Sequence, residues 1–411
     1  MSELKYRFYC FAHYAVKKLL GRSQLTVGNM FSSSTAKLGT DESNAKTLWE
    51  RFINASVIPD GVEHAGTLYA GYIGETKEWC LPSWIWTTAA TIRAYCANSE
   101  IEKAKSLADN LAAQQQECGG WIVRNDYDER GAIPMLAPND SAYIANNAFV
   151  ELYLATKEQK YLDVARRCAD WIVETARPDG IVYTGYNMRD EKWDKSCVIV
   201  DTGFTGGLFS RICDITKEDK YLNFLKRFID RYIELFYIPD AHGFCTSINK
   251  DDRQQGGMFG RGQAWALEGL IPAYNVLKDD KIKSVIDDTV GNLVKMQHKN
   301  GGWAYNLTKP LMGEDCKAIS VIAKSMMEWY VFSKDERCRQ SAERALDWCR
   351  KHTAIEGEAK GGIFSFCMEG AVVQNLYTSC AFVYASAYAI ELEQMLRNEQ
   401  NNNINKNTSG R

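Results

Sequence analysis

The sequence predicts an all-α protein, an (α/α)6 barrel, in which amphipathic helices alternate with helices that are apolar nearly all round. Two observations support this fold. Similar apolar helical stretches recur about every 60 residues along the 411-residue chain, and a repeat of this size indicates a repeated two-helix unit. Between them lie segments with apolar residues at i, i+3, i+4 and i+7, as expected for helices half exposed to water.

The amphipathic segments are predicted to form the outer helices of the barrel. The first spans 41–57 and carries Leu48, Phe52 and Ile53 on its apolar face. The others are 101–114, the helices opened by Lys160-Tyr161-Leu162 and by Lys220-Tyr221-Leu222, 280–298 and 335–352. An outer helix therefore opens each of six repeats.

The apolar segments are predicted to form the inner helices, because a helix that is apolar on every side must be buried. They span 84–96, the stretches that begin near 140, 201 and 260, then 316–332 and 377–396. Asp140, Asp201 and Gln263 lie near the start of three of them, about 60 residues apart. We therefore expect these side chains, together with Trp84, to converge near one end of the barrel.

The predicted barrel spans 41–397 as a single catalytic domain, with a segment of different composition on each side. Residues 398–411 are rich in Asn and short of apolar residues, which indicates a disordered tail. Residues 1–40 form an N-terminal extension, in which 5–22 mixes aromatic and basic side chains. This stretch could lie on a membrane surface as an amphipathic helix. The interpretation that we favour is packing on the barrel or on a second subunit.

Composition narrows the class of protein and its partners. A net charge of −3 leaves no basic footprint, so nucleic acid is not an expected partner. The thirteen cysteines are scattered, mostly in apolar helical stretches, without a Cys-x-x-Cys pair. Buried free thiols favour a reducing compartment, and with no secretory signal or membrane-spanning run we expect a cytoplasmic protein.

The stretch 260–267 combines groups that an acidic sugar would need. It follows a glycine-rich loop (Gly256, Gly257 and Gly260) that permits tight turns and close backbone approach. Arg261 offers a planar fork of donors that suits a carboxylate, and Gln263 offers both a donor and an acceptor. Trp265 offers a flat apolar face. Taken alone, the stretch could equally be a helix start with a packed tryptophan.

Asp140 and Asp201 are the candidate catalytic residues. A single aspartate at a helix start is usually an N-cap. Two aspartates at equivalent repeat positions, in helices almost free of other charge, favour catalysis instead. A carboxyl group in an apolar, aromatic-lined site has a raised pKa and can donate a proton near neutral pH. A pair of carboxyl groups can divide acid and base roles, as in glycoside hydrolysis.

Aromatic side chains are dense in the predicted loops and inner-helix starts, where their faces could stack on sugar rings. Trp84, Phe259 and Trp265 are the candidates for substrate binding, whereas Trp86 and Trp303 are expected to be structural. His242 lies in the turn 240–244. It could contact substrate, although a surface turn explains the same sequence.

Val200-Asp201-Thr202 opening an apolar helix, followed about one repeat later by Gly260-Arg261-Gly262-Gln263-Ala264-Trp265, resembles the unsaturated glucuronyl hydrolases and the related unsaturated rhamnogalacturonyl hydrolases. By repeat spacing the resemblance spans 84–388. It implies an (α/α)6 barrel that needs no metal or other cofactor. The implied substrate is an oligosaccharide that ends in a 4,5-unsaturated uronic acid.

The resemblance also implies roles for individual residues. Asp201 would protonate the vinyl ether at C4 and help water add at C5, while Asp140 would assist and hold the ring. The sequence departs from the family pattern at Asn139, where a histidine is common, and at Phe259, where a tryptophan is common.

Functions of other classes remain open at this point. An ordinary inverting glycosidase on the same barrel needs only two suitably spaced carboxylates. A sugar 2-epimerase of the acylglucosamine type would be expected to use histidines of the inner helices, which carry none here. A terpene cyclase would share Gly-Gly-Trp-like loops, but the Asp-x-Asp-Asp motif is missing. A glycan-binding barrel without catalysis is the non-enzymatic alternative. Sugar identity, linkage and oligomeric state are not predicted.

Overall fold

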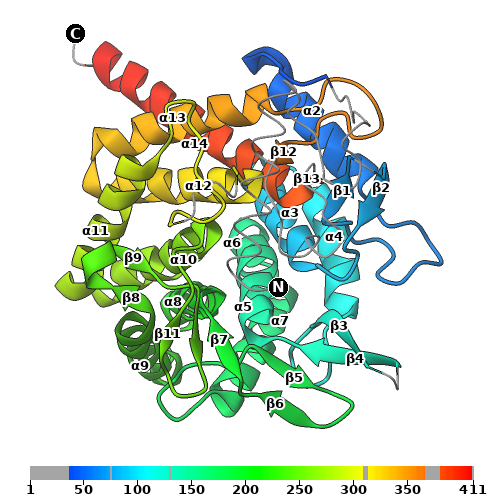
Figure 1. Cartoon of the computed structure of the whole chain (residues 1–411), viewed down its shortest axis with the longest axis vertical. Helices are drawn as coiled ribbons and strands as arrows, with labels where there is room; N and C mark the ends of the chain where they lie inside the picture. The colour runs from blue at the N-terminus through cyan, green and yellow to red at the C-terminus, as the bar shows by residue number, and fades with distance from the viewer. Residues whose placement is uncertain (1–36, 75, 129–130, 309–312, 366–379, 410–411) are drawn as a thin grey trace. The chain divides into compact units, whose positions relative to one another are not determined.

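The computed structural model describes residues 37–74, 76–128, 131–308, 313–365 and 380–409, with the backbone alone at 125–128 and 402–409 (Figure 1). Most of the predicted N-terminal extension, and with it the amphipathic stretch 5–22, lies outside the described residues. Two compact units divide the chain. One contains 57–69 and 81–293, and the other contains the described residues up to 56, 70–80 and those from 294 onward.

In the unit built from 57–69 and 81–293, buried and half-exposed helices alternate along the chain as the sequence predicts (Figure 1). The first and last buried helices are α3 (Trp86–Ala97) and α10 (Gly260–Leu277). The second is built from three segments in succession, α5 (Pro138–Ile144), the π-helical η1 (Ala145–Val150) and α6 (Glu151–Thr156). The third consists of η2 (Val200–Gly203) followed by α8 (Phe204–Thr216). The half-exposed helices are α4 (Ile101–Ala113), α7 (Gln159–Thr175), α9 (Asp219–Phe236) and α11 (Asp280–Met296), whose last turn belongs to the other unit.

The pattern of each helix matches its surroundings. In α9, four aromatic residues at i, i+4 spacing form the buried face, with neighbouring ring centroids 5.0–6.3 Å apart: Phe224, Phe228, Tyr232 and Phe236. In contrast, α10 is buried over most of its length. Its Glu268 is paired with Arg93 of α3, with Oε1 3.2 Å from Nη1. A charge buried this deeply needs such a partner.

The buried helices of this unit other than α3 end in the same short turn. Lys157 after α6, Lys217 after α8 and Lys278 after α10 adopt left-handed conformations with φ of 61°, 58° and 54°. In each case the lysine N–H donates to the carbonyl oxygen four residues earlier. A residue in this conformation closes a helix C-terminus. Because an acidic residue follows and the next helix starts at once, a Lys-Asp or Lys-Glu pair marks the return from a buried to a half-exposed helix.

The Gly-Gly-Trp loop at 119–121 is fixed by its backbone. Gly119 has a φ of 104°, and a Cβ there would lie 2.5 Å from the carbonyl oxygen of Arg167, so only glycine fits. The Gln115 amide donates to the carbonyl oxygen of Gly119 at 2.8 Å, and the Trp121 indole donates to that of Leu111 at 2.8 Å. The loop thereby leads into the first strand of a small sheet.

The strands of this unit form small antiparallel sheets at the starts of the buried helices (Figure 1). One sheet has the order β3-β4-β5-β6, from β3 (Ile122–Asp128), β4 (Gly131–Leu136), β5 (Gly185–Asn187) and β6 (Lys192–Asp194). Another has the order β11-β10-β7, from β7 (Cys197–Ile199), β10 (Ser247–Asn249) and β11 (Gln254–Gln255). β8 (Tyr237–Ile238) pairs with β9 (Gly243–Phe244).

The other unit contains the remaining predicted helices. They are α2 (Glu42–Ala55), α12 (Cys316–Ser333), α13 (Glu336–Lys351) and α14 (Val383–Ser409), with a sheet of order β12-β13-β1-β2 from β12 (Phe364–Ser365), β13 (Cys380–Phe382), β1 (Gly71–Ile73) and β2 (Glu78–Cys80). Trp303 is fully buried, as expected of a structural residue. α12 ends at Lys334 in the same left-handed turn (φ 56°).

Several boundaries differ from the sequence prediction. α3 begins at Trp86, because Trp84 lies in the preceding turn. α14 begins at Val383, and the start predicted at Tyr377 lies outside the described residues. α14 also continues to Ser409 through the segment expected to be disordered. Side-chain pairs such as Gln394 with Asn398 (2.9 Å) support a polar helix that extends from a buried stem. In the described part of the chain no helix has both the length and the apolar character needed to span a membrane.

Candidate active site

Each segment that carries a predicted acidic residue directly follows a strand, β4 of the sheet β3-β4-β5-β6 or β7 of the sheet β11-β10-β7. The chain leaves β4 at Leu136 and begins α5 at Pro138, so Asp140 lies in the first turn of α5. It leaves β7 at Ile199 and enters η2, which contains Asp201. A proline at the start of a helix has no N–H to leave unsatisfied, which favours the start at this point. Both carboxyl groups thus lie at the N-terminal end of a buried helix, as predicted.

The sheet β11-β10-β7 joins the segment before Asp201 to the loop before α10. β7 pairs with β10, and the N–H of Val200 continues this pairing by donating to the carbonyl oxygen of Thr246 at 3.0 Å. β10 pairs in turn with β11, after which the chain reaches α10. The position of the first turn of α10 is therefore coupled to that of η2 through backbone hydrogen bonds.

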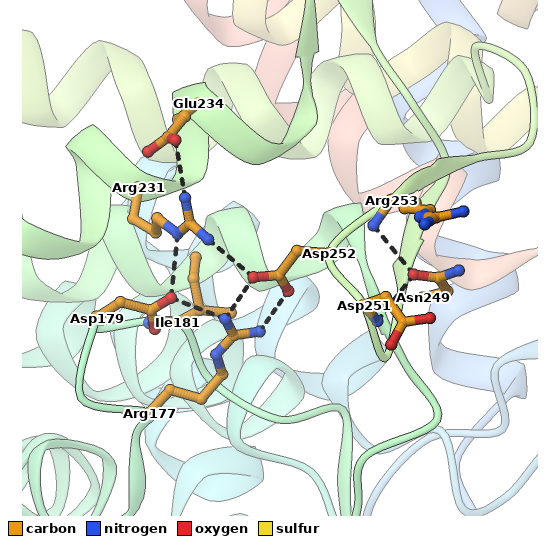
Figure 2. A network of polar contacts seen from close by, with 9 residues as sticks. All are labelled: Arg177, Asp179, Ile181, Arg231, Glu234, Asn249, Asp251, Asp252 and Arg253. Carbon is orange, nitrogen blue, oxygen red and sulfur yellow. Dashed lines mark hydrogen bonds and ion pairs between the residues drawn. The ribbon is translucent and has the colours of Figure 1, made fainter.

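A cluster of charged side chains, which we call the arginine–aspartate cluster (Arg177, Asp179, Arg231 and Asp252), fixes the turn between β10 and β11 (Figure 2). Both oxygens of Asp252 accept from Arg177 at 2.8 Å, and Arg231 donates to the same carboxylate at 2.8 Å. Asp252 itself has a φ of 59°. Bidentate geometry makes such a pair stronger and more specific than a simple ion pair.

The two candidate carboxyl groups influence each other's protonation. Burial raises the pKa of Asp140 to about 6, and the positive charge of Arg124 offsets part of this rise. Burial, and after it the charge of Asp140, raises the pKa of Asp201 to about 8. A side-chain hydrogen bond from Asn139 and the charges of Arg124 and Arg261 act in the opposite direction on Asp201. Near neutral pH the pair therefore favours a proton on Asp201 and a carboxylate at Asp140.

One oxygen of Asp201 is held away from donors of the protein. Its Oδ1 is buried and makes no hydrogen bond within the described residues. Tyr232 is nearby, and its pKa is raised by burial, then by Cys245 and by Asp201. Its hydroxyl, however, donates to the carbonyl oxygen of Val200 at 2.8 Å. Because no donor of the described residues contacts this oxygen, the ionised form of Asp201 is less stabilised, which agrees with its raised pKa.

Arg261 lies in the first turn of α10 against two aromatic rings. Its guanidinium carbon is 4.9 Å from the ring centroid of Phe259 and 5.3 Å from that of Trp265. The side chain is 5 % exposed, so the charge is largely removed from water. Contact with aromatic faces stabilises such a cation and restrains its orientation. The charge of Arg261 acts on Asp201, which brings these two predicted site residues into one site.

Glycines allow α10 to approach η2 closely. A Cβ on Gly262 would lie 2.7 Å from Cγ1 of Val200, and a Cβ on Gly269 would lie 2.1 Å from the carbonyl oxygen of Gly203. Neither position has room for a larger side chain without backbone movement. The glycine after Arg261 thus has a packing role, because it sets the spacing between the helices that carry Arg261 and Asp201.

Gln263 uses its amide to hold the backbone. Its Oε1 accepts from the N–H of Phe244 at 2.7 Å, and its Nε2 donates to the carbonyl oxygens of Phe244 (2.9 Å) and Phe259 (3.1 Å). The side chain is 1 % exposed. This geometry favours a positioning role that ties β9 to the start of α10. A substrate contact through Gln263 remains a prediction.

The predicted aromatic residues Trp84, Phe259 and Trp265 belong to one continuous series of ring contacts. Adjacent centroids are 4.6–6.3 Å apart in the series Trp84, Trp86, Tyr143, Phe204, Trp265 and Phe259. Tyr143 and Phe204 each follow a candidate aspartate by three residues, so the series passes along the same helix starts. Trp84, Trp86 and Trp265 are only half-buried. Trp86, expected to be structural, thus belongs to the same series as Trp84.

His242 occupies a surface turn. Its side chain is 53 % exposed and lies 3.6 Å from the carboxylate of Asp288 in α11, and its φ is 49°. Asn292 of α11 donates to the carbonyl oxygens of Ala241 and His242. The side chain thus faces an outer helix and solvent, and this placement does not support a substrate contact.

The sequence prediction missed Arg124, and it named Asn139 only as a departure from the family pattern. Arg124 lies in β3, where spacing within the repeats gives no signal, because the strands do not share the helical periodicity. Asn139 precedes Asp140 directly and is 2 % exposed. Its position in the predicted site was evident, but its hydrogen bond to Asp201 depends on how α5 and η2 pack. The described residues contain no group of three or more His, Cys, Asp or Glu side chains that could hold a metal ion.

Solved structures similar to this chain include carbohydrate-active enzymes. An unsaturated glucuronyl hydrolase specific for heparin is 16 % identical with a TM-score of 0.68, over 87 % of this chain and 96 % of that one. The unsaturated glucuronyl hydrolase from Bacillus sp. GL1 is 13 % identical with a TM-score of 0.67, over the same shares. A sugar epimerase from a ruminal bacterium is 13 % identical with a TM-score of 0.66, over 86 % and 97 %. These likenesses show the (α/α)6 barrel fold, which confirms the predicted fold class.

The family is given by the sequence itself. No curated protein matches the chain significantly. The family model described as Glycosyl Hydrolase Family 88 matches residues 75–390, a range that includes both candidate aspartates and the stretch around Arg261. The match extends over more than half of the 411 residues. The chain is therefore a glycoside hydrolase, and it belongs to Glycosyl Hydrolase Family 88.

Proposed function

We propose that the protein hydrates the C4=C5 double bond of an unsaturated uronic acid at the end of an oligosaccharide, with Asp201 as general acid and base and Asp140 assisting. The observation that carries this proposal is the position of Asp140 and Asp201 at the starts of two buried helices within the range matched by the family, where burial raises the pKa of both carboxyl groups. Proton transfer to carbon needs an acid that is still protonated near neutral pH, and burial supplies one here.

The charges around the pair favour an anionic substrate. The guanidinium groups of Arg124 and Arg261 both act on Asp201, so the site carries positive charge that suits the carboxylate of a uronic acid. Arg261 is the candidate for that contact, because its fork of donors matches a carboxylate and its orientation is restrained by aromatic rings. Trp84 and Trp265 are the candidate stacking surfaces for the sugar rings.

The proposed reaction balances with water as the only co-reactant. The Asp201 proton passes to C4, and a water oxygen bonds to C5 while its proton returns to the Asp201 carboxylate. The resulting hemiketal at C5 opens by breaking its bond to the ring oxygen, which becomes a hydroxyl group on C1. C1 is then a hemiacetal, which collapses to an aldehyde and releases the rest of the oligosaccharide as an alcohol.

The test is Asp201→Asn with a disaccharide produced by a polysaccharide lyase. The amide keeps the shape of the side chain but delivers no proton, so turnover should fall by about 10²- to 10⁴-fold. Loss of the conjugated enoate absorbance measures turnover, and calorimetry measures binding, which should be retained. Asp214→Asn is the matched control, since Asp214 lies on α8, which directly follows η2 in the chain, and is exposed there and paired with Lys217.

Three results would contradict the proposal. Full turnover by the Asp201→Asn protein would remove the proposed acid from the mechanism. Hydrolysis of a saturated disaccharide, without action on its unsaturated counterpart, would support an ordinary inverting glycosidase with the same two carboxyl groups. Binding of both sugars without turnover in the unmodified protein would support a glycan-binding barrel.

The cytoplasmic location also remains part of the proposal. It rests on the chemistry of the cysteines, because those of the described residues are free thiols and most are buried. Free thiols are typical of a reducing compartment.

A further inference from the structure

Val200, the residue before Asp201, is held through its backbone and through its side chain. Its N–H donates to the carbonyl oxygen of Thr246 at 3.0 Å, and its carbonyl oxygen accepts from the Tyr232 hydroxyl at 2.8 Å. Its side chain packs on the first turn of α10, where a Cβ on Gly262 would lie 2.7 Å from Cγ1 of Val200. The chain segment that leads to Asp201 therefore has a fixed direction relative to α10.

Thr246 lies between β9 and β10 and contacts a second part of the site. Its hydroxyl donates to the carbonyl oxygen of Gly257 at 2.6 Å, in the glycine-rich loop before α10. Gly256 of that loop has a φ of 75°, and a Cβ there would lie 2.8 Å from the Cβ of Thr246. Glycine thus allows the loop to pass directly over Thr246. Thr246 thereby joins the segment before Asp201 to the loop before Arg261.

The loop 256–259 ends at Phe259, whose ring lies against Arg261. The ring centroid of Phe259 is 4.9 Å from the guanidinium carbon of Arg261 and 5.5 Å from the ring centroid of Trp265. The carbonyl oxygen of Phe259 accepts from the Gln263 amide at 3.1 Å. Because contact with aromatic faces restrains a cation, the orientation of Arg261 depends on the position of Phe259.

We infer that Thr246 is a positioning residue of the active site, whose hydroxyl holds the loop 256–259 so that Phe259 keeps Arg261 oriented for a substrate carboxylate. The inference rests on the proposed function in one respect, because it takes Arg261 as the group that binds the uronate. Thr246 acts through the loop, so loss of its hydroxyl should weaken substrate binding more than it slows the chemical step.

The test begins with Thr246→Val, which keeps the shape of the side chain but replaces the hydroxyl with a methyl group. A methyl carbon cannot approach a carbonyl oxygen as closely as the 2.6 Å of this hydrogen bond, so the loop must move. KM for an unsaturated disaccharide should rise by roughly 2- to 10-fold, the range that one neutral hydrogen bond is worth, with a smaller effect on kcat. Thr246→Ser retains the hydroxyl and should restore KM to a value near that of the unmodified protein.

Thr175→Val is the matched control. Thr175 is half-buried like Thr246, and its hydroxyl donates to the carbonyl oxygen of Trp171 at 2.7 Å. Donor and acceptor both belong to the outer helix α7, so KM should not change. An equal rise in KM in the two valine variants would overturn the inference. A fall in kcat at unchanged KM in Thr246→Val would overturn it as well.

A measurement without substrate separates this inference from the proposed function. Nitrogen-15 NMR of labelled arginine side chains gives the Nε–H signal of Arg261, assigned with Arg261→Lys, and the ring currents of Phe259 and Trp265 act on this signal. A change in Thr246→Val that is absent from Thr246→Ser supports the inference, even if the protein does not act on unsaturated disaccharides. An unchanged signal in Thr246→Val, or an equal change in both Thr246 variants, overturns it whatever the activity. Circular dichroism confirms that the comparison is made on folded protein.

Discussion

At the scale of single residues, Arg261 is the side chain whose replacement separates binding from chemistry most cleanly. It is nearly buried, it contacts Phe259 and Trp265, and its charge reaches Asp201. Hydrogen bonds to a charged partner are worth about 1.5–3 kcal/mol. We expect Arg261→Ala to raise KM for an unsaturated disaccharide by roughly 10- to 150-fold, with a smaller effect on kcat, as steady-state kinetics will show.

Arg261→Lys is the companion variant in that experiment. Lysine retains the charge but not the planar fork, so the KM of this variant should lie between the KM of the unmodified protein and that of Arg261→Ala. If kcat falls instead while KM is unchanged, Arg261 acts in the transition state and not in binding the ground state.

The residues that the sequence predicted and those that it missed differ for a physical reason. Asp140 and Asp201 stand out because a charge in an apolar helix is costly and recurs at equivalent positions. Gln263 has the same repeat spacing, yet its amide is engaged with the backbone of Phe244 and Phe259. Spacing gives the position of a side chain but not its partners. Arg124 was missed because it lies in β3, next to a register shift between Ile122 and Arg124 that no local sequence pattern marked.

At the scale of elements, the arginine–aspartate cluster stabilises the β10–β11 hairpin that precedes α10. Asp252→Asn removes the charge that both Arg177 and Arg231 contact. Since these side chains are 20–26 % exposed, we expect a loss of about 1 kcal/mol in the free energy of unfolding at low salt, and less at high salt. Chemical denaturation at two salt concentrations measures both values.

The same hairpin supplies the control for that measurement. Asp251 is exposed, and its carboxylate forms no ion pair with the described residues, as Figure 2 illustrates. Asp251→Asn should therefore leave both values almost unchanged. An equal, salt-independent loss in the two variants would show that the cluster contributes no specific electrostatic stability.

Helices were predictable from the sequence and strands were not. Each predicted outer helix is present, because an apolar face of period 3.6 is a signal several turns long. The strands have seven residues or fewer, and many have two or three, too few to show an alternation. The left-handed turns at Lys157, Lys217, Lys278 and Lys334 do carry a signal, the Lys-Glu or Lys-Asp pair. That signal is visible only once the helix ends are known.

At the scale of the whole molecule, the repeat of about 60 residues was sufficient to predict the fold class. The fold is shared with solved structures whose sequence identity to this chain is only 13–16 %. Burial requires an apolar side chain but does not specify which one, so a pattern of apolar positions can be kept while the individual residues change. The predicted single-domain boundary at 41–397 and the N-terminal extension remain predictions.

The carboxyl pair also has a thermodynamic consequence for the entire chain, through proton linkage. The pKa values of Asp140 and Asp201, about 6 and about 8, lie above the ordinary value of 3.8. From about pH 4 up to those values the folded state binds more protons than the unfolded state, so the free energy of unfolding falls as pH rises. The destabilisation is complete only above the higher pKa and absent below the ordinary one.

The amide of the Asp201→Asn variant cannot ionise, so the variant should lack the part of this decrease in the free energy of unfolding that comes from Asp201. Thermal unfolding of the two proteins between about pH 4 and pH 9 should give similar melting temperatures in acid and a higher one for the variant in alkali. A difference that does not vary with pH would contradict the linkage. If the linkage holds, the two side chains proposed to carry out the reaction also define a pH range in which the folded state releases protons and loses stability as pH rises. This contribution is opposite in direction to that of carboxylates such as Asp252, whose pKa is lowered by neighbouring arginines.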